Sequence, residues 1–184
     1  MKILAISGSL RATSLNTAVL HAAGRLAPAG VNIELFEAIG NLPFFNSDLE
    51  GEHLPQQVAR FRTAIGLADG LLISSPEYAR GVSGVMKNAL DWLVGSHEFP
   101  GKPVALINTS PRATHALAAL TVTLETMSAQ LVKDASITLP LLGTVNDAES
   151  IAANPDYAGP LRGALERFVG AIRARSGNNR DEAH

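Results

Sequence analysis

Short apolar segments alternate with longer segments of helical periodicity along the chain, and this alternation limits the possible folds more than any other feature. Each apolar segment has the length of a strand and carries mostly apolar side chains, which is typical of strands covered on both faces. These candidate strands are Ile3–Ile6, Val31–Phe36, Gly70–Ser75, Val104–Asn108 and Ala135–Leu139. The helical patterns fall at residues 14–27, 54–68, 82–95, 114–131 and 156–175.

Alternation of strands and helices in one chain predicts an α/β protein with a parallel, doubly wound sheet between two helical layers. With five candidate strands and a phosphate-type loop after the first, the expected strand order is 2-1-3-4-5. A chain of 184 residues suits one domain with a full core. We expect that domain at residues 1–175 and a disordered polar tail at residues 176–184.

The composition excludes several classes of function. The sequence contains no cysteine, which rules out disulfides, thiolate catalysis and cysteine-ligated metals. No histidine has a second ligand at metal-binding spacing, and a formal net charge of −2 offers no basic surface to nucleic acid. The chain starts directly in a candidate strand, and no apolar segment has the length that spans a bilayer. We therefore expect a cytoplasmic protein without a metal, nucleic-acid or membrane partner.

The loop between the first strand and the first helix, residues 7–14, carries the strongest functional signal. A helix N-terminus leaves backbone N–H groups without partners and holds the positive end of the helix dipole. Hydroxyls and a guanidinium beside it make a site for phosphate. The alternative is an ordinary helix cap, with Thr13 or Ser14 as the capping residue and Arg11 solvated. The polar side chains of this region are Ser7, Ser9, Arg11, Thr13, Ser14, Asn16 and Thr17.

The glycine content of this loop indicates which kind of phosphate group it can bind. The Walker loop and the dinucleotide fingerprint both need several glycines at fixed spacing, and Gly8 is the only glycine in this loop. Hydroxyl side chains in place of glycine amides suit a small phosphate monoester. Flavin mononucleotide (FMN) at the switch point of a doubly wound sheet carries such a group.

Ligands of doubly wound sheets bind beyond the carboxyl ends of the strands, so two further loops matter, at residues 75–82 and 109–114. In the first of these, proline and glycine shape a backbone that can lie flat against a planar ligand, and Tyr78 adds an aromatic surface. Glu77 is either a solvated acid or the partner of a basic residue at a helix end. Asn88, on the following helix, is in a position to reach back and hold the loop of Pro76.

Three motifs together resemble the NADPH-dependent FMN reductase family. They are Ser-Gly-Ser-Leu-Arg-x-x-Ser-x-Asn at residues 7–16, Ser-Pro-Glu-Tyr at 75–78 and Lys-Asn-Ala-Leu-Asp-Trp at 87–92. The resemblance covers nearly the whole chain in order and spacing. It implies a flavodoxin-like fold, FMN as cofactor, NADPH or NADH as co-substrate, and hydride transfer through FMN to quinones or other small acceptors. It also implies a homodimer or homotetramer.

In this family the flavin itself carries the redox chemistry, so the resemblance implies no catalytic side chain. The residues expected to bind the cofactor come from all three loops. They are Ser9, Arg11, Ser14, Asn16, Thr17, Pro76, Glu77, Tyr78, Ala79, Gly81 and Ser110.

The sequence departs from the family pattern at two places. The family commonly has asparagine after Pro-Glu-Tyr, where this chain has Ala79 and then Arg80. Many members have a glycine pair after the fourth strand, where residues 108–115 contain no glycine. Arg80, Arg112 and His115 are candidate contacts for the substrate or NADPH, with a solvated surface role as the alternative for each.

Two other functions stay open, the first of them because of these departures. One is a flavin-poor binding or regulatory protein. The other is a flavodoxin-type electron carrier that does not use NAD(P)H, although the small net charge of −2 disfavours a carrier that docks through acidic charge. The apolar segment Leu42–Phe45 predicts an oligomer contact, because an exposed Phe44–Phe45 pair is costly on a monomer.

Overall fold

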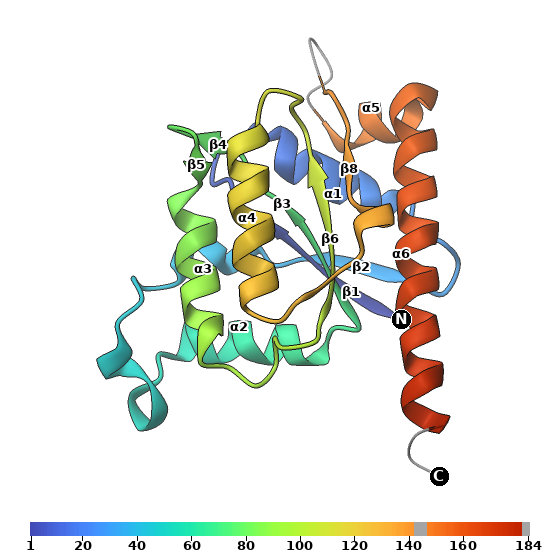
Figure 1. Cartoon of the computed structure of the whole chain (residues 1–184). Helices are drawn as coiled ribbons and strands as arrows, with labels where there is room; N and C mark the ends of the chain where they lie inside the picture. Colours follow the sequence, from blue (N-terminus) through green and yellow to red (C-terminus); the bar gives the residue numbers. More distant parts are fainter. Residues whose placement is uncertain (142–146, 182–184) are drawn as a thin grey trace.

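A parallel sheet in the expected strand order forms the middle of the protein (Figure 1). The structure is a computed structural model that describes residues 1–141 and 147–181, with side chains as far as residue 175. β2 pairs with β1, β1 with β3 and β3 with β6, and two short strands, β7 and β8, fill the fifth position beside β6. The strands are β1 Lys2–Ser7, β2 Asn32–Leu35, β3 Gly70–Ser74, β6 Pro103–Asn108, β7 Gln130–Leu131 and β8 Ile137–Thr138.

The fifth position of the sheet differs from the single strand expected at residues 135–139. β7 pairs with the start of β6 and β8 with its end, and a 3-10 turn, η4 Lys133–Ala135, lies between them. The Ser136 hydroxyl accepts the backbone N–H of Leu106 at 3.1 Å. A side chain therefore replaces one rung of the backbone ladder. The position in the sheet is confirmed, and the expected continuous strand is wrong.

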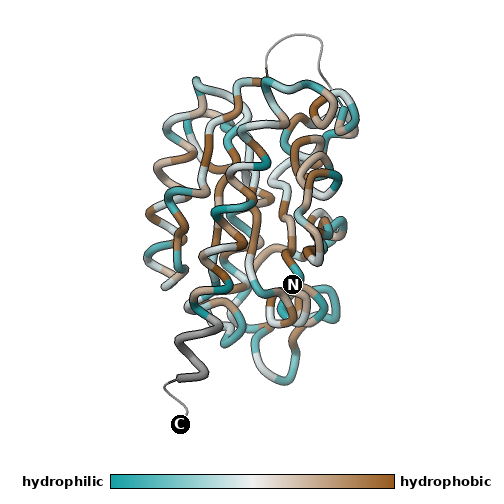
Figure 2. Tube along the Cα trace, turned by 90° about the vertical axis from the view of Figure 1, so that its right-hand side faces the viewer, coloured by the Kyte–Doolittle hydropathy of each residue, from teal (hydrophilic) through white to brown (hydrophobic). Residues whose placement is uncertain are grey.

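Helices cover both faces of the sheet and enclose two apolar cores. One face carries α1 Leu15–Arg25, α5 Ala148–Ala153 and α6 Pro155–Asp181, and the other carries α2 Gln56–Leu67, α3 Gly84–Val94 and α4 Thr114–Thr126. Alternate strand residues enter different cores: Ile3 faces the first helical layer and Leu4 the second. In Figure 2 the interior strands are mostly hydrophobic, whereas the outer loops are hydrophilic.

Two helices end at other residues than the periodicity predicts. α4 ends at Thr126 rather than residue 131, because Ser128 adopts a φ of 63° and the chain turns there into β7. α6 continues to Asp181, into the segment expected to be a disordered tail, and residues 182–184 lie outside the described part. The short helix α5 was not expected. No helix in residues 1–141 and 147–181 is long and apolar enough to cross a membrane.

The long connection between β2 and α2 is fixed to the body of the protein. It contains the 3-10 turns η1 Glu37–Asn41, η2 Ser47–Leu49 and η3 Gly51–His53. The guanidinium of Arg62, on α2, donates to Glu50 Oε1 at 2.8 Å and through Nε to the Trp92 carbonyl at 2.9 Å. Because Arg62 is only 9% exposed, these partners balance a charge that is largely removed from water.

The apolar part of this connection is held against α3 by Asn88 and Trp92. The carbonyl of Pro43 accepts hydrogen bonds from Asn88 Nδ2 at 3.0 Å and Trp92 Nε1 at 2.7 Å. The backbone N–H of Phe45 donates to Asn88 Oδ1 at 2.8 Å, and the Phe45 ring meets Trp92 edge-on. Asn88 therefore binds this segment and not the Pro76 loop, so that expectation was wrong. Between these contacts, Phe44 is left 89% exposed.

Candidate active site

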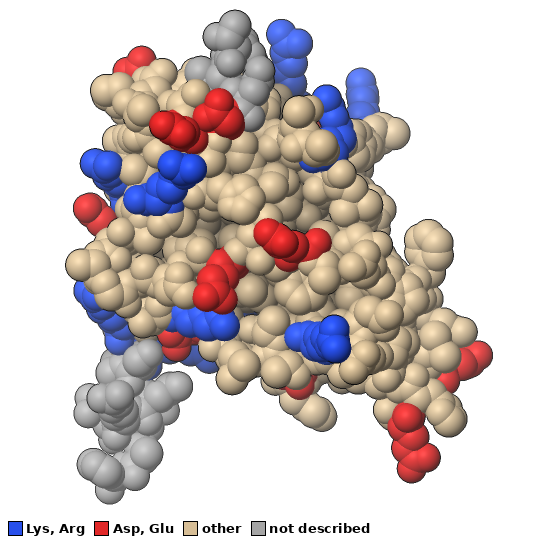
Figure 3. Space-filling model, turned by 180° about the vertical axis from the view of Figure 1, so that it is seen from behind, with Lys and Arg blue, Asp and Glu red and all other residues tan. Residues whose placement is uncertain are grey.

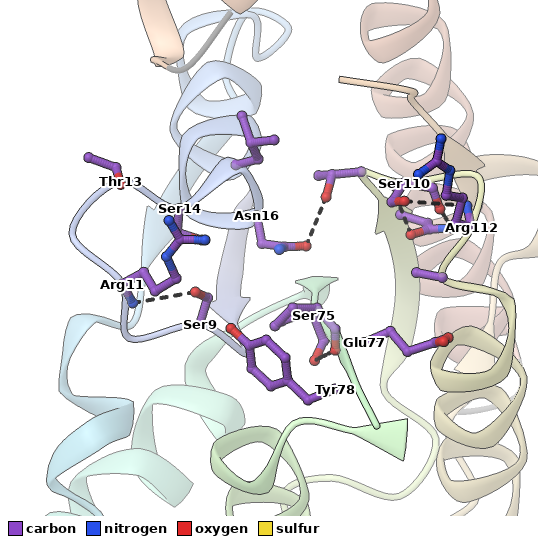
Figure 4. Close-up of a pocket in the computed structure, with 15 residues that line it drawn as sticks. Ser9, Arg11, Thr13, Ser14, Asn16, Ser75, Glu77, Tyr78, Ser110 and Arg112 are labelled. Carbon is purple, nitrogen blue, oxygen red and sulfur yellow. Dashed lines mark hydrogen bonds between the residues drawn. The ribbon is translucent and has the colours of Figure 1, made fainter. Parts of the chain in front are cut away.

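Three loops enclose a cavity of about 650 Å³ at the carboxyl end of the sheet (Figure 4). They follow β1, β3 and β6, which are the loops that the strand order selects. The volume lies within the usual range of small-molecule pockets. The lining residues are Ser9, Arg11, Thr13, Ser14, Leu15, Asn16, Ser75, Pro76, Glu77, Tyr78, Asn108, Thr109, Ser110, Arg112 and Ala113.

The loop after β1 presents hydroxyls and the N-terminus of α1 to the cavity. Ser14 caps the helix, because its hydroxyl accepts the Thr17 N–H at 3.2 Å. Ser14 also lines the cavity, together with Ser9 and Arg11. The capping and phosphate-binding roles are therefore compatible. Thr17 does not line the cavity, since its hydroxyl lies 2.8 Å from the Ser7 hydroxyl inside the loop.

Asn16 joins all three loops. Its Oδ1 lies 2.8 Å from the Ser74 hydroxyl at the end of β3 and 3.2 Å from the Thr109 hydroxyl after β6. All three residues are buried, so these hydrogen bonds are shielded from competing water. Figure 4 shows the Asn16 side chain projecting between the loops. Asn16 therefore fixes the relative positions of the cavity walls as well as lining the cavity.

The first and second loops touch closely at Gly8. A Cβ at this position would lie 2.3 Å from the Ser75 hydroxyl oxygen and 2.9 Å from that of Ser83. The Ser83 hydroxyl donates to the Gly8 carbonyl at 2.7 Å and accepts the Met86 N–H at the start of α3. A side chain at position 8 would force these loops apart, which explains the glycine without any role in phosphate binding.

The loop after β3 folds into a hairpin of β4 Glu77–Tyr78 and β5 Gly81–Val82. Its two-residue turn, Ala79–Arg80, has φ values of 49° and 59°, a turn that usually carries Asn-Gly. The site residues expected in this loop fall into two groups. Pro76, Glu77 and Tyr78 line the cavity, whereas Ala79, Arg80 and Gly81 do not.

Two side chains of the hairpin have defined surroundings. Glu77 Oε2 accepts the Ala116 N–H at 2.8 Å, so this carboxylate caps α4 and is not simply solvated. Tyr78 is 53% exposed, and in Figure 4 its ring lies below the loop of Ser9 and Arg11. The hairpin thereby supplies an aromatic edge to the cavity and helps to fix α4.

The loop after β6 is ordered by side chains in place of the missing glycines. Asn108 Nδ2 donates to the Ser110 carbonyl at 2.7 Å, and Asn108 Oδ1 accepts the Ser110 N–H at 3.2 Å. The Ser110 hydroxyl accepts the Arg112 N–H at 3.3 Å. Ser110 and Arg112 line the cavity. His115 lies in the first turn of α4, is exposed and does not line it.

Positive charge predominates around the cavity. The three loops contribute Arg11, Arg80 and Arg112 against one carboxylate, that of Glu77, although the whole chain has a net charge of −2. Seen from behind in Figure 3, basic side chains gather at the upper right, the end of the protein that carries the β4–β5 hairpin. This distribution favours anionic ligands. Residues 1–141 and 147–175 contain no group of three or more acidic or histidine side chains that could hold a metal.

Sequence reasoning missed several lining residues, namely Leu15, Ser75, Asn108, Thr109 and Ala113, and it counted Thr13 among the polar side chains of the phosphate loop without including it in the cofactor-binding set. Most of them fall within or beside the loops that the strand order selects, so the strand order indicated where they would lie. The missing information was the direction of each side chain. The hydroxyls, the α1 terminus and Arg11 fit the phosphate of FMN, and the broad cavity beyond them is of a size that can hold its ring system.

Comparison with known proteins places the chain in a family. The sequence model for NADPH-dependent FMN reductase matches residues 1–140. The chain is 45% identical over 112 residues to an NAD(P)H-dependent FMN reductase of Pseudomonas aeruginosa, which covers 60% of each protein. It is 42% identical over 113 residues to a 2-hydroxy-1,4-benzoquinone reductase of a Burkholderia species, which covers 60% of this chain and 61% of that protein. The matched part thus spans about three fifths of these relatives.

Comparison with solved structures gives a consistent result. A flavoenzyme NAD(P)H:(acceptor) oxidoreductase from Paracoccus denitrificans is 32% identical, with a TM-score of 0.77 over 94% of this chain and 97% of that one. An archaeal flavodoxin with 13% identity and a TM-score of 0.64, covering 94% of this chain and 99% of its own, resembles it in fold alone. The expected flavodoxin-like fold is confirmed. Because the family's sequence model covers residues 1–140 of 184, the chain belongs to the NADPH-dependent FMN reductase family.

Proposed function

We propose that the protein is an FMN-dependent oxidoreductase that transfers hydride from NAD(P)H, through FMN, to quinones or other small acceptors. The observation that carries this proposal is the hydroxyl-rich N-terminus of α1, which opens into the cavity at the carboxyl end of the sheet. Relatives named FMN reductase and quinone reductase, at 36–45% identity, support the same activity.

The loop after β1 binds the phosphate in this proposal. The hydroxyls of Ser9, Thr13 and Ser14 donate hydrogen bonds, and the unpartnered N–H groups of α1 add the positive end of the helix dipole. Arg11 supplies a charge-assisted hydrogen bond. Asn16 keeps this loop in register with the other two.

The other two loops hold the ring system. FMN, when bound, supplies the hydride chemistry between NAD(P)H and the acceptor. Pro76, Tyr78 and Ser110 line the cavity, and Figure 4 shows Tyr78 and Ser110 on different sides of it. These residues orient the cofactor and leave one of its faces open to NAD(P)H and then to the acceptor. Asn108 and Ser110 fix the second wall through mutual hydrogen bonds.

The purified protein allows a direct test. We expect added FMN to bind with a change in its visible spectrum, and the loaded protein to oxidise NADPH in a reaction that depends on a quinone. Tight FMN binding without NAD(P)H oxidation would identify an electron carrier instead. Absence of FMN binding would identify a binding protein and overturn the proposal.

We also propose that the protein is a homodimer or homotetramer in which Phe44 contacts a second copy. Phe44 is 89% exposed, while its neighbours are held on α3 by Asn88 and Trp92. An aromatic side chain on a fixed backbone loses little freedom on binding and is typical of interface hot spots. A cytoplasmic location is also part of the proposal.

A further inference from the structure

Arg112 is an exposed cationic side chain at the cavity. It lines the cavity, and its backbone is held by the Ser110 hydroxyl in a loop that Asn108 fixes. No acidic group of residues 1–141 or 147–175 forms an ion pair with its guanidinium. A guanidinium without an ion pair, on a loop whose backbone is held in place, is available to an anionic ligand.

The cofactor phosphate does not account for this charge. The phosphate belongs beside the α1 N-terminus, where Ser9, Ser14 and Arg11 converge. Arg112 lies on the opposite side of the cavity in Figure 4. In the same loop, the polar groups of Asn108 and Ser110 are engaged with each other. The site therefore has two separate cationic positions. The second also lies beside a helix N-terminus, that of α4, but there the Ala116 N–H already bonds the Glu77 carboxylate, so this helix end is less available to phosphate.

The anion that meets Arg112 can come from NADPH or from the acceptor. The 2′-phosphate of NADPH lies on the adenosine, at the far end of the molecule from the nicotinamide. In the proposed function the cavity walls hold the flavin ring, and Arg112 is exposed, so its guanidinium is open to the ligand that stacks on the flavin, which is the nicotinamide and then the acceptor. Position thus favours a negatively charged group on the acceptor itself.

We propose that Arg112 selects quinones that carry a negative charge on or beside the ring, such as hydroxy-, carboxy- or sulfo-quinones. The proposal rests on the proposed reductase function and names its substrate class. In the overall reaction NAD(P)H loses a hydride and becomes NAD(P)⁺, and the quinone gains that hydride and one solvent proton and becomes the hydroquinone. Arg112 takes no part in this exchange and acts only through its charge on the substituent.

The test compares two acceptors on the FMN-loaded enzyme, anionic 1,4-naphthoquinone-2-sulfonate and neutral 2-methyl-1,4-naphthoquinone. In Arg112→Gln we expect the ratio of their kcat/KM values, anionic over neutral, to fall about tenfold or more, mainly through KM. Arg112→Lys should recover much of the ratio because it restores the charge. Arg60→Gln is the matched control, since Arg60 is exposed on α2 and does not line the cavity, and its ratio should equal that of the wild type.

A second readout does not need turnover. Naphthalene-2-sulfonate is not reducible, and its binding to the oxidised holoenzyme can be followed by the flavin spectrum. We expect its dissociation constant to rise about tenfold in Arg112→Gln. An unchanged ratio and unchanged sulfonate binding would overturn the proposal.

Two other results would also overturn it. One is an equal loss with both acceptors, and the other is a loss that appears with NADPH but not with NADH, which would assign Arg112 to the 2′-phosphate. If the wild type fails to bind FMN or to reduce the neutral quinone, the proposed function itself fails, so the two failures are distinguishable.

Discussion

At the scale of single residues, the site depends on side chains that fix other groups as much as on those that face the ligand. Asn16 was expected to bind the cofactor, and the structure shows it bonded to Ser74 and Thr109 on the two neighbouring loops. Glu77 was expected at the flavin, and its carboxylate caps α4 at Ala116. Both line the cavity. Their roles toward FMN remain predictions, while their roles in holding the site are explicit in the hydrogen bonds.

Arg11 gives the sharpest residue-scale test of the phosphate site. In Arg11→Ala we expect the dissociation constant for FMN to rise about tenfold to a hundredfold, because a charge-assisted hydrogen bond to phosphate contributes about 1.5–3 kcal/mol. Riboflavin, which lacks the phosphate, should bind the variant and the wild type equally. Fluorescence titration with both ligands measures this, with Arg60→Ala as control. Equal losses for FMN and riboflavin would show that Arg11 does not contact phosphate.

At the scale of elements, apolar strands were the best predicted parts. β1, β3 and β6 are buried along nearly their whole length, and such segments are recognisable without a partner. β7 and β8 are two residues each and exist only through their pairing with β6, so no local pattern marks them. The end of α4 depends on the left-handed backbone of Ser128, and a serine in the sequence does not predict that conformation.

In the site, too, the sequence predicted the location of the loops better than the direction of single residues. Strand order located the three loops, because it follows from the alternation of elements. It did not reveal that Thr17 turns into its own loop, or that Ala79 and Arg80 form a turn outside the cavity. Those outcomes depend on backbone direction at single positions. The Asn that the family commonly has at position 79 is well suited to the positive φ of this turn, which gives a structural reason for it at that position.

The β4–β5 turn leads to a prediction about stability. Ala79 and Arg80 both adopt positive φ, a conformation that disfavours side chains other than Asn and Gly. The double variant Ala79→Asn, Arg80→Gly should raise the free energy of unfolding by about 1 kcal/mol. Urea denaturation measures the change. Arg80→Gln, which keeps a side chain at the strained position, should bring no gain. A loss of stability in the double variant would contradict this account of the turn.

At the scale of the whole molecule, one apolar side chain stands out on the surface. Phe44 is 89% exposed while the segment that carries it is fixed on α3. If this surface contacts a second copy, Phe44→Ser should raise the dissociation constant of the oligomer about thirtyfold, the effect of losing a hot spot of about 2 kcal/mol. Sedimentation equilibrium measures it, and Leu67→Ser, at another exposed apolar residue, is the matched control. A monomeric wild type, or equal effects of both variants, would contradict the proposed interface.

The central claim is that this chain holds FMN in the cavity at the carboxyl end of the sheet, where NAD(P)H can reduce it. The most direct measurement is an anaerobic titration of the FMN-loaded protein with NADPH, followed by addition of a quinone. We predict that one equivalent of NADPH bleaches the visible absorption of the flavin and that one equivalent of quinone restores it. Tightly bound flavin that keeps its absorption in excess NADPH and NADH would contradict the account.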